Sequence, residues 1–127
     1  DSGESHIAYF FHEVDGFSKF GKYTGNGSTD GPFNHCGFRP AYVVIKNEQN
    51  ATPWMVFDNE RDTGNPAVTY LVTYGTNTDG SSPNDNAIDF VANGFKLTED
   101  HADMNDNGVA MYWWAFAEVP LKYANAR

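Results

Sequence analysis

The segment VTYLVTY (68–74) alternates two kinds of position along its whole length. Val68, Tyr70, Val72 and Tyr74 occupy every second position, and Thr69, Leu71 and Thr73 lie between them. Successive side chains of a β-strand point to opposite faces, so this alternation predicts a strand with one face against a core. Its β-branched and aromatic residues favour the same conformation.

Six other segments share this strand-like composition, and clusters of Gly, Pro, Asn and Asp separate them. They are HIAYFFHEV (6–14), AYVVIK (41–46), WMVFD (54–58), AIDFV (87–91), GFKL (94–97) and VAMYWWAFAEV (109–119). No segment sustains the helical period of 3.6 residues. We therefore expect an all-β fold, specifically an antiparallel β-sandwich of lectin-like or jelly-roll type.

The composition of the 127 residues excludes several classes of partner. The formal net charge is −9, from 8 Lys and Arg against 17 Asp and Glu, and such a charge repels polyphosphates and anionic lipids. No apolar run approaches the ~20 residues of a membrane span. We expect no binding to nucleic acid and no membrane insertion, and we retain cations and neutral glycans as ligands.

The two ends of the chain resemble each other. The segment DSGESHIAYFFHEV (1–14) aligns without a gap on DNGVAMYWWAFAEV (106–119), with identities at Asp1/Asp106, Gly3/Gly108, Glu13/Glu118 and Val14/Val119. Two strands of one sandwich can look alike because strands use few residue types. Alternatively, residues 1–22 are the closing strand and linker of a preceding tandem repeat, and residues 23–127 are a single β-sandwich repeat domain. In both cases Ile7, Tyr9 and Phe11 are predicted to be buried on one face of a strand.

The stretch YTGNGSTDGPFNHCGFRP (23–40) is predicted to be a string of turns, since its glycines and its Asn, Asp and Ser residues favour turns. A phosphate-binding loop is excluded because the GKS/T ending and the following helix are both missing. We expect this stretch to be the linker and entry turn of a repeat. Because the chain begins at Asp1 rather than Met, we also expect it to be part of a longer polypeptide.

Several blocks taken together carry a family resemblance. They are GNGSTDGPF (25–33), GFRPAYVVIKN (37–47), the pattern W-x3-D-x2-R (Trp54, Asp58, Arg61), NGFKL (93–97) and WAFAEVPLKYANAR (114–127). In combination they resemble a repeat domain of phage and prophage virion proteins, usually tail-fibre or other tail-associated proteins. The resemblance implies a virion or extracellular setting, other virion subunits as partners and a homo-oligomer. It implies no catalytic set and no cofactor.

Two acidic segments offer candidate chemistry. In DNERD (58–62), Asp58, Glu60 and Asp62 would align on one strand face, as a sandwich glycosidase requires, but turn residues follow at once and we favour a solvated strand end. In DMNDNG (103–108), Asp103, Asn105 and Asp106 are hard oxygen ligands of the kind that Ca²⁺ takes, but the bidentate Glu of a full site is missing. We favour a turn that needs no metal.

Two further pairs of neighbouring residues, His35 with Cys36 and Trp113 with Trp114, have side chains that could form a site. His35 and Cys36 do not form a nucleophile and its base, because consecutive strand residues face opposite ways, so a packed cysteine is expected. If Trp114 faces inward, Trp113 faces solvent and is available to a ligand or subunit. The candidate ligand-binding residues are Trp54, Asp58, Arg61 and Trp113.

These features favour a non-enzymatic structural or receptor-binding module of a phage virion, which binds a host surface glycan. One alternative is a self-assembling subunit of a virion or extracellular filament, joined by strand exchange. The other alternative is a sandwich-fold glycoside hydrolase that uses the carboxylates of 58–62.

Overall fold

The computed structural model describes residues 3, 5, 7–49, 51–73, 79–81 and 87–119, and nearly all regular structure in these ranges is β-strand. The larger of two sheets has the strand order β1-β9-β3-β4-β5-β6. Its strands are β1 (Ser18–Thr24), β3 (Pro40–Asn47), β4 (Met55–Asp58), β5 (Thr69–Val72), β6 (Asp79–Ser81) and β9 (Ala110–Ala117). Every neighbouring pair is antiparallel.

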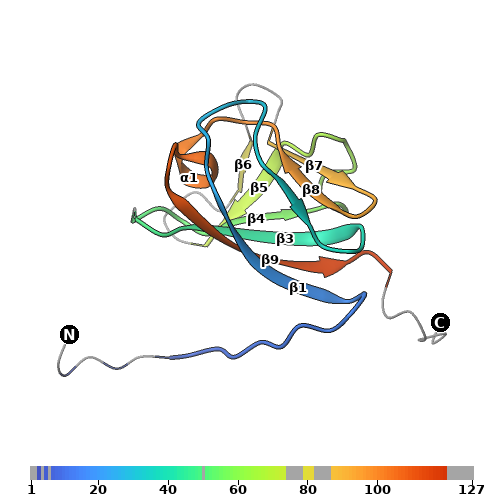
Figure 1. The fold of residues 1–127 in the computed structure, drawn as a ribbon, viewed down its shortest axis with the longest axis horizontal. Helices are drawn as coiled ribbons and strands as arrows, with labels where there is room; N and C mark the ends of the chain where they lie inside the picture. Colours follow the sequence, from blue (N-terminus) through green and yellow to red (C-terminus); the bar gives the residue numbers. More distant parts are fainter. Residues whose placement is uncertain are drawn as a thin grey trace.

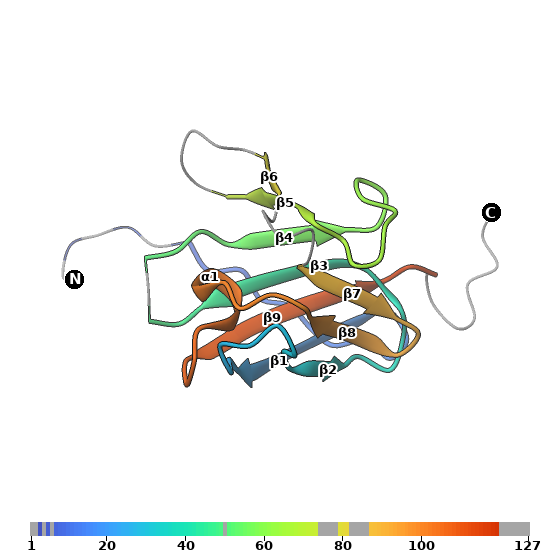
Figure 2. The ribbon, with the colours of Figure 1, turned by 90° about the horizontal axis from the view of Figure 1, so that it is seen from above.

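The smaller sheet has the order β2-β8-β7 and is also antiparallel. Its strands are β2 (Phe33–His35), β7 (Ile88–Val91) and β8 (Gly94–Leu97), and the short helix α1 (Ala102–Asn105) follows them. Figures 1 and 2 show this sheet lying across one face of the large sheet, over the part formed by β1, β9 and β3. In the described part of the chain, no helix has the length and apolar character needed to cross a membrane.

The core lies between the two sheets and is built from alternate strand residues. Val43 and Ile45 enter it from β3, and Phe95 and Leu97 enter it from β8; all four are 0% exposed. The ring of Trp113 on β9 packs edge-to-face on Phe95, with 5.2 Å between centroids. Burying each such side chain contributes about 1.5–3 kcal/mol, so the contact between the sheets is the main source of stability.

The predicted antiparallel β-sandwich is confirmed. The strands predicted over 41–46, 54–58, 68–74, 87–91, 94–97 and 109–119 correspond to β3, β4, β5, β7, β8 and β9. Tyr70 and Val72 pack against the core from β5, as the alternation in 68–74 indicates, while Tyr74 lies outside the described residues.

Three strands form where the sequence indicated turns or a linker. They are β1 (SKFGKYT), β2 (FNH) and β6 (DGS), which are short or interrupt their larger side chains with glycine and polar residues. β1 is nevertheless paired with β9 over its full seven residues, from Ser18 to Thr24. Neighbouring strands supply the hydrogen bonds here, so tertiary pairing overrides weak strand propensity. The expected boundary between residues 22 and 23 falls inside this strand.

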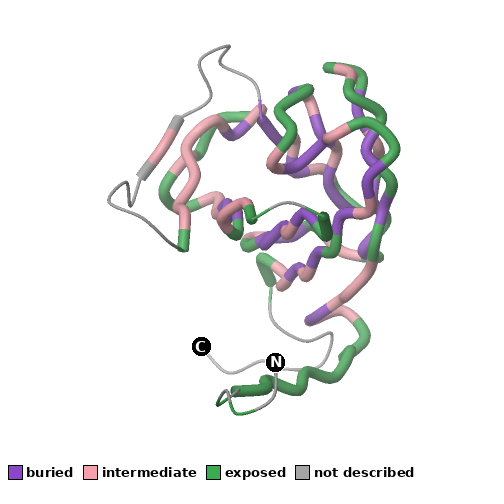
Figure 3. Tube along the Cα trace, turned by 90° about the vertical axis from the view of Figure 1, so that its left-hand side faces the viewer, coloured by how far each residue is buried: buried purple, intermediate pink, exposed green. Residues whose placement is uncertain are grey.

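The strand predicted over 6–14 is wrong for the described residues. Residues 7–13, here called the N-terminal arm, form no strand, and Figure 3 shows them as an exposed segment beside the two-layered body. Ile7 is 81% exposed, Tyr9 78% and Phe11 62%, so the predicted burial is also wrong. A strand needs a neighbour to satisfy its backbone, and the arm has only one bridge, from Val14 to Ser18, at its end.

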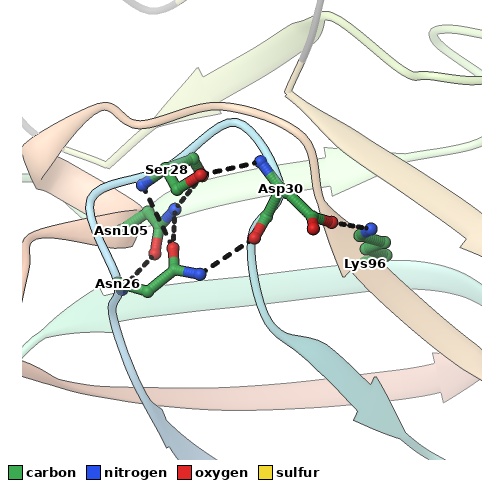
Figure 4. Close-up of polar contacts among 5 residues, drawn as sticks. All are labelled: Asn26, Ser28, Asp30, Lys96 and Asn105. Atoms are coloured by element: carbon green, nitrogen blue, oxygen red, sulfur yellow. Dashed lines mark hydrogen bonds and ion pairs between the residues drawn. The ribbon is translucent and has the colours of Figure 1, made fainter.

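The glycine-rich stretch connects the two sheets of one sandwich, because residues 25–32 run from β1 to β2. Asn105 of α1 holds this connection, as Figure 4 shows. Its Nδ2 donates to Asn26 Oδ1 at 3.1 Å and to the Ser28 carbonyl at 2.8 Å, and its Oδ1 accepts from the Asn26 amide at 2.9 Å. Lys96 of β8 forms an ion pair with Asp30 at the far end of the loop.

One glycine in this connection is required by close packing. A Cβ on Gly25 would lie 2.2 Å from the carbonyl oxygen of Asp106, well inside contact distance. The backbones of β1's end and of the turn after α1 therefore touch, and the Gly25 amide donates to the Val109 carbonyl at 2.9 Å.

Candidate functional site

The large sheet has one face that the small sheet does not cover, and aromatic side chains gather there. We call this surface the outer aromatic face: Phe20 on β1, Tyr42 on β3, Trp54 before β4, and Tyr112, Trp114 and Phe116 on β9. The strand register brings these residues together, since Phe20 lies opposite Trp114 and Tyr42 lies opposite Phe116. Cross-strand neighbours on one face are close enough for their rings to touch.

The rings form two contacting groups. Phe116 meets Phe20 at 6.5 Å and Tyr42 at 6.1 Å between centroids, and Trp54 meets Trp114 at 4.9 Å with an interplanar angle of 76°. Such tilted and edge-to-face geometries are the ones that aromatic pairs prefer.

Two aliphatic side chains lie under this aromatic layer. Val44 and Val56 are cross-strand partners on β3 and β4, and they point away from the core between the sheets. They are only 3% and 6% exposed, because the aromatic rings around them exclude water. The outer face is thus a packed apolar surface whose outermost atoms meet solvent: Trp54 and Tyr112 are each 43% exposed.

A shallow depression of about 350 Å³ lies beside Trp54. Its lining consists of Lys46, Ala51, Thr52, Pro53, Trp54 and Thr73. The Lys46 ammonium donates to the Asn47 carbonyl at 2.6 Å and to Thr52 Oγ1 at 3.4 Å, so it is held at one side of the depression. This site combines an exposed aromatic ring with a fixed cation and two hydroxyl groups.

A polar group lies at the other end of β4. Asp58 Oδ1 accepts from the Arg61 amide at 2.6 Å, and Asp58 Oδ2 lies 3.5 Å from Arg61 Nη2. Tyr42 is the cross-strand partner of Asp58. Partial burial raises the pKa of the Tyr42 hydroxyl, and the charge of Asp58 raises it further, so this hydroxyl is protonated and can donate a hydrogen bond.

The sequence of the chain matches a family described as a domain of unknown function, DUF7483, over residues 1–120. The chain belongs to this DUF7483 family. No curated protein and no solved structure matches it. Its arrangement of residues is therefore the basis for any statement about function.

Of the four predicted ligand-binding residues, Trp54 belongs to the outer aromatic face of this DUF7483 domain, and Asp58 and Arg61 lie together at the other end of β4. Trp54 and Asp58 have the same parity along β4 and its approach, about 13 Å apart at ~3.3 Å per residue, and Arg61 contacts Asp58. No sequence pattern indicated that Phe20, Tyr42, Trp114 and Phe116 lie on this outer face. The composition of AYVVIK (41–46) predicts a strand, but its consecutive apolar residues Val43, Val44 and Ile45 do not indicate which face meets solvent.

The prediction that Trp113 faces solvent is wrong. Trp113 is 5% exposed and points into the core, while Tyr112 and Trp114 point outward. Gly21 lies opposite Trp113 on β1, and a Cβ there would lie 2.6 Å from its ring, so the glycine makes room for the indole. Both faces of β9 carry aromatic residues, so hydrophobicity alone does not distinguish the buried face.

The carboxylates of 58–62 do not line one strand face, because β4 ends at Asp58 and a turn follows. Glu60 is exposed. Asp62 accepts hydrogen bonds from the amides of Val68 at 2.8 Å, Thr69 at 3.0 Å and Gly64 at 3.0 Å. The Val68 and Thr69 amides hold the pKa of Asp62 below its usual range, and the carboxylate organises the loop before β5.

The side chains of the candidate calcium loop contact other parts of this domain. The oxygen of Asn105 accepts from the Asn26 amide, and Asp103 lies in the first turn of α1, beside His101. Among the described residues, no group of three or more His, Cys, Asp or Glu side chains is placed to hold a metal ion.

Cys36 is packed, as predicted. It is 6% exposed, and burial raises the pKa of its thiol to about 12. His35 is exposed on the neighbouring position of β2. A thiol with this pKa is protonated at neutral pH and is a poor nucleophile.

Proposed function

We propose that this DUF7483 domain is a non-enzymatic structural and receptor-binding module of a phage virion, and that it binds a neutral surface glycan of the host on its outer aromatic face. The observation that carries the proposal is Trp54, which is half-exposed, is braced by Trp114 and borders the depression with Lys46 and Thr52. The virion setting rests on the sequence blocks that resemble tail-associated repeat domains.

The chemistry of the face fits a sugar. Pyranose rings present an apolar face of C–H groups, which packs on an aromatic ring, and hydroxyl groups at the rim, which need hydrogen-bond partners. Trp54 offers the ring, and Lys46, Thr52 and Thr73 offer partners around it. The net charge of −9 favours neutral over phosphorylated or sulfated glycans.

The non-enzymatic part of the proposal rests on the two better-placed carboxylates. Asp58 is paired with Arg61, and Asp62 accepts three backbone hydrogen bonds. Proton transfer in a glycosidase needs a carboxyl that stays protonated near neutral pH, whereas the pKa of Asp62 is lowered.

The test measures binding of neutral bacterial surface polysaccharides by calorimetry and by NMR shifts of the Trp54 indole N–H. We expect binding by the intact chain and a loss of about tenfold or more in affinity for Trp54→Ala, as removal of a stacking ring predicts. Phe33→Ala is the matched control, since Phe33 is 49% exposed but lies on β2 of the small sheet. An equal loss in the control, or release of reducing ends by the intact chain, would contradict the proposal.

A second candidate function is a self-assembling subunit. It is favoured by a different observation, the exposed apolar side chains of the N-terminal arm, and it leads to the following inference.

A further inference from the structure

The N-terminal arm carries apolar side chains that nothing in the described chain covers. Phe10 is 94% exposed, Ile7 81%, Tyr9 78% and Phe11 62%. The ring of Phe11 approaches Phe20 at 5.8 Å, which is the aromatic contact of the arm with the body of the domain. Four large side chains in this state expose several hundred Å² of apolar surface, an area of roughly the size that marks an interface.

The β1 strand has one edge without a partner strand among the described residues, since β9 is its neighbour on the other side. Ser18 exchanges both backbone hydrogen bonds with Val14, which lies on this open edge. Backbone direction alternates along a strand, so Phe20, Lys22 and Thr24 direct their N–H and C=O groups to the same edge. An open row of this kind is a template for an added strand.

The segment before β1 in the same chain pairs with this edge at one residue pair, Val14 with Ser18, and the arm before Val14 does not continue the pairing. In a regular hairpin His12 would follow Val14 and pair with Phe20. Instead, the Ser18 hydroxyl donates to the His12 carbonyl at 3.1 Å, and the Glu13 carboxylate accepts from the Phe20 amide at 3.1 Å. Glu13 is also paired with Lys19 at 2.8 Å. These side-chain contacts replace the next backbone pair, so the arm leaves its own β1 and the edge stays open from Lys22 onward.

An apolar depression adjoins the open part of the edge on the outer face. It has a volume of about 460 Å³ and is lined by Phe20, Gly21, Lys22, Tyr112, Trp113 and Trp114. A strand added to β1 would direct every second side chain to this face, next to the depression. A large aromatic side chain, such as that of Phe10, which is 94% exposed, suits its apolar floor.

The charges of the two elements are complementary. Residues 1–12, the part of the chain that is free to leave its own β1, include two acidic residues, Asp1 and Glu4, and no Lys or Arg. The β1 segment carries Lys19 and Lys22 and no acidic residue. Lys22 is exposed at the centre of the open edge. Two β1 edges would bring like charges together if they paired with each other, so an acidic strand is the better occupant.

We infer that the open edge of β1 at Lys22 and Thr24 binds the N-terminal arm of a second copy of this chain, whose aromatic side chains occupy the adjacent depression. The interaction is strand addition between copies, with the Glu13 contacts kept in place within each copy. It lies on the same outer face as the proposed glycan site, and Trp114 borders both the depression and Trp54; Trp54 itself lies beside β4, three strands from β1. Reciprocal exchange closes a dimer, and one-directional exchange builds a chain of subunits.

The test measures the mass of the intact chain by light scattering over a concentration series. We expect a dimer or larger species that dissociates on dilution, and a folded monomer after deletion of residues 1–11, which leaves Glu13 and Val14 in place. Lys22→Glu should weaken association by about tenfold or more, because it places like charge against the arm, and Lys22→Gln should have a smaller effect.

Single substitutions separate this interface from other contacts. Phe10→Ser removes an exposed ring of the arm and should weaken association, whereas Phe33→Ser removes an exposed ring of the small sheet and should not. A synthetic peptide of residues 1–14 should bind to the deleted chain and slow hydrogen exchange at the Lys22 and Thr24 amides.

Several results would overturn the inference. One is a monomer at every concentration, including a monomer whose Lys22 amide is protected because the arm has folded back on its own β1. Another is association that survives the deletion or that Lys22→Glu and Phe10→Ser leave unchanged, since association would then use another surface. Loss of glycan binding by Trp54→Ala is read independently, so failure of either proposal leaves the other testable.

Discussion

Asn105 Nδ2 donates a hydrogen bond of 2.8 Å to the carbonyl oxygen of Ser28, which lies 77 residues earlier in the chain. The same nitrogen donates to the Glu99 carbonyl at 2.8 Å, and Asn105 is 0% exposed. One buried amide thus joins the β1–β2 connection to the segment before α1. A buried polar side chain of this kind stabilises the fold only while its partners are all in place.

Replacement of Asn105 should destabilise the domain strongly. Asn105→Ala leaves the Ser28 and Glu99 carbonyls without their donor, and we expect a loss of about 2–4 kcal/mol in the free energy of unfolding. Asn105→Asp should cost at least as much, since a carboxylate would face two carbonyl oxygens. Urea denaturation measures the loss. Asn107→Ala is the control because Asn107 is exposed, and a similar loss there would contradict the assignment.

Asp62 should make stability depend on acid pH. Its pKa is lowered in the folded chain by the Val68 and Thr69 amides, so its contribution is present above the unfolded pKa and is lost as the pH falls through the folded value. We expect Asp62→Asn to lose about 1–3 kcal/mol at pH 7. The difference in the free energy of unfolding between this variant and the intact chain should become smaller below about pH 4. Glu60→Gln should change the free energy of unfolding little at either pH. If the loss caused by Asp62→Asn is the same at both pH values, the Asp62 carboxylate does not stabilise the fold through its charge.

Trp113 should be a core residue and Tyr112 a surface residue. Trp113→Ala removes an indole that packs on Phe95, and we expect a loss of about 3–5 kcal/mol. Tyr112→Ala should cost less than about 1 kcal/mol, because Tyr112 is 43% exposed. Thermal and urea denaturation of the two variants give the comparison. The opposite order would mean that β9 presents its other face to the core.

Cys36 should resist alkylation in the native domain. Burial raises the pKa of its thiol to about 12, so at pH 8 only about one thiol in ten thousand is ionised. Iodoacetamide followed by mass measurement should label the chain in denaturant and leave the native chain unlabelled over the same time. Rapid native labelling would show that the segment after β2, which contains Cys36, opens readily.

Calcium should have little effect on stability. The Asn105 side chain is fully used in hydrogen bonds to Asn26, Ser28 and Glu99, so the 103–108 segment cannot offer it as a ligand. We expect a chelator to shift the midpoint of thermal unfolding by less than about 1 °C. A large decrease that Ca²⁺ alone restores would contradict this.

Much of the fold could be predicted because strand alternation is a local property. In VTYLVTY (68–74) the alternation shows which residues share a face, and in AYVVIK (41–46) the β-branched and aromatic composition predicts a strand; β5 and β3 form there. β1 could not be found in the same way. Its Gly21 and Lys22 weaken the local signal, and hydrogen bonds to β9, about 90 residues later, make it a strand.

The candidate site could likewise be predicted only in part from the sequence. Trp54, Asp58 and Arg61 were candidates because the W-x3-D-x2-R block of the family resemblance contains them, and the first two have the same parity along β4 and its approach. Trp113 was assigned to the wrong face because Tyr112, Trp113 and Trp114 are all aromatic. The space left by Gly21 on the neighbouring strand decides which of them is buried.

The sequence by itself determined the all-β class, the turn-rich connections and the acidic character of the domain, because propensity, alternation and charge are local or additive quantities. The tertiary structure alone decided which face of the large sheet the small sheet covers, and so which aromatic residues meet solvent. It also decided that the N-terminal arm, which precedes Val14, does not pair with β1. The side chains of Ser18 and Glu13 bind the His12 carbonyl and the Phe20 amide, which a hairpin would pair with each other. These outcomes depend on contacts between strands that are distant in sequence, and no local pattern records such contacts.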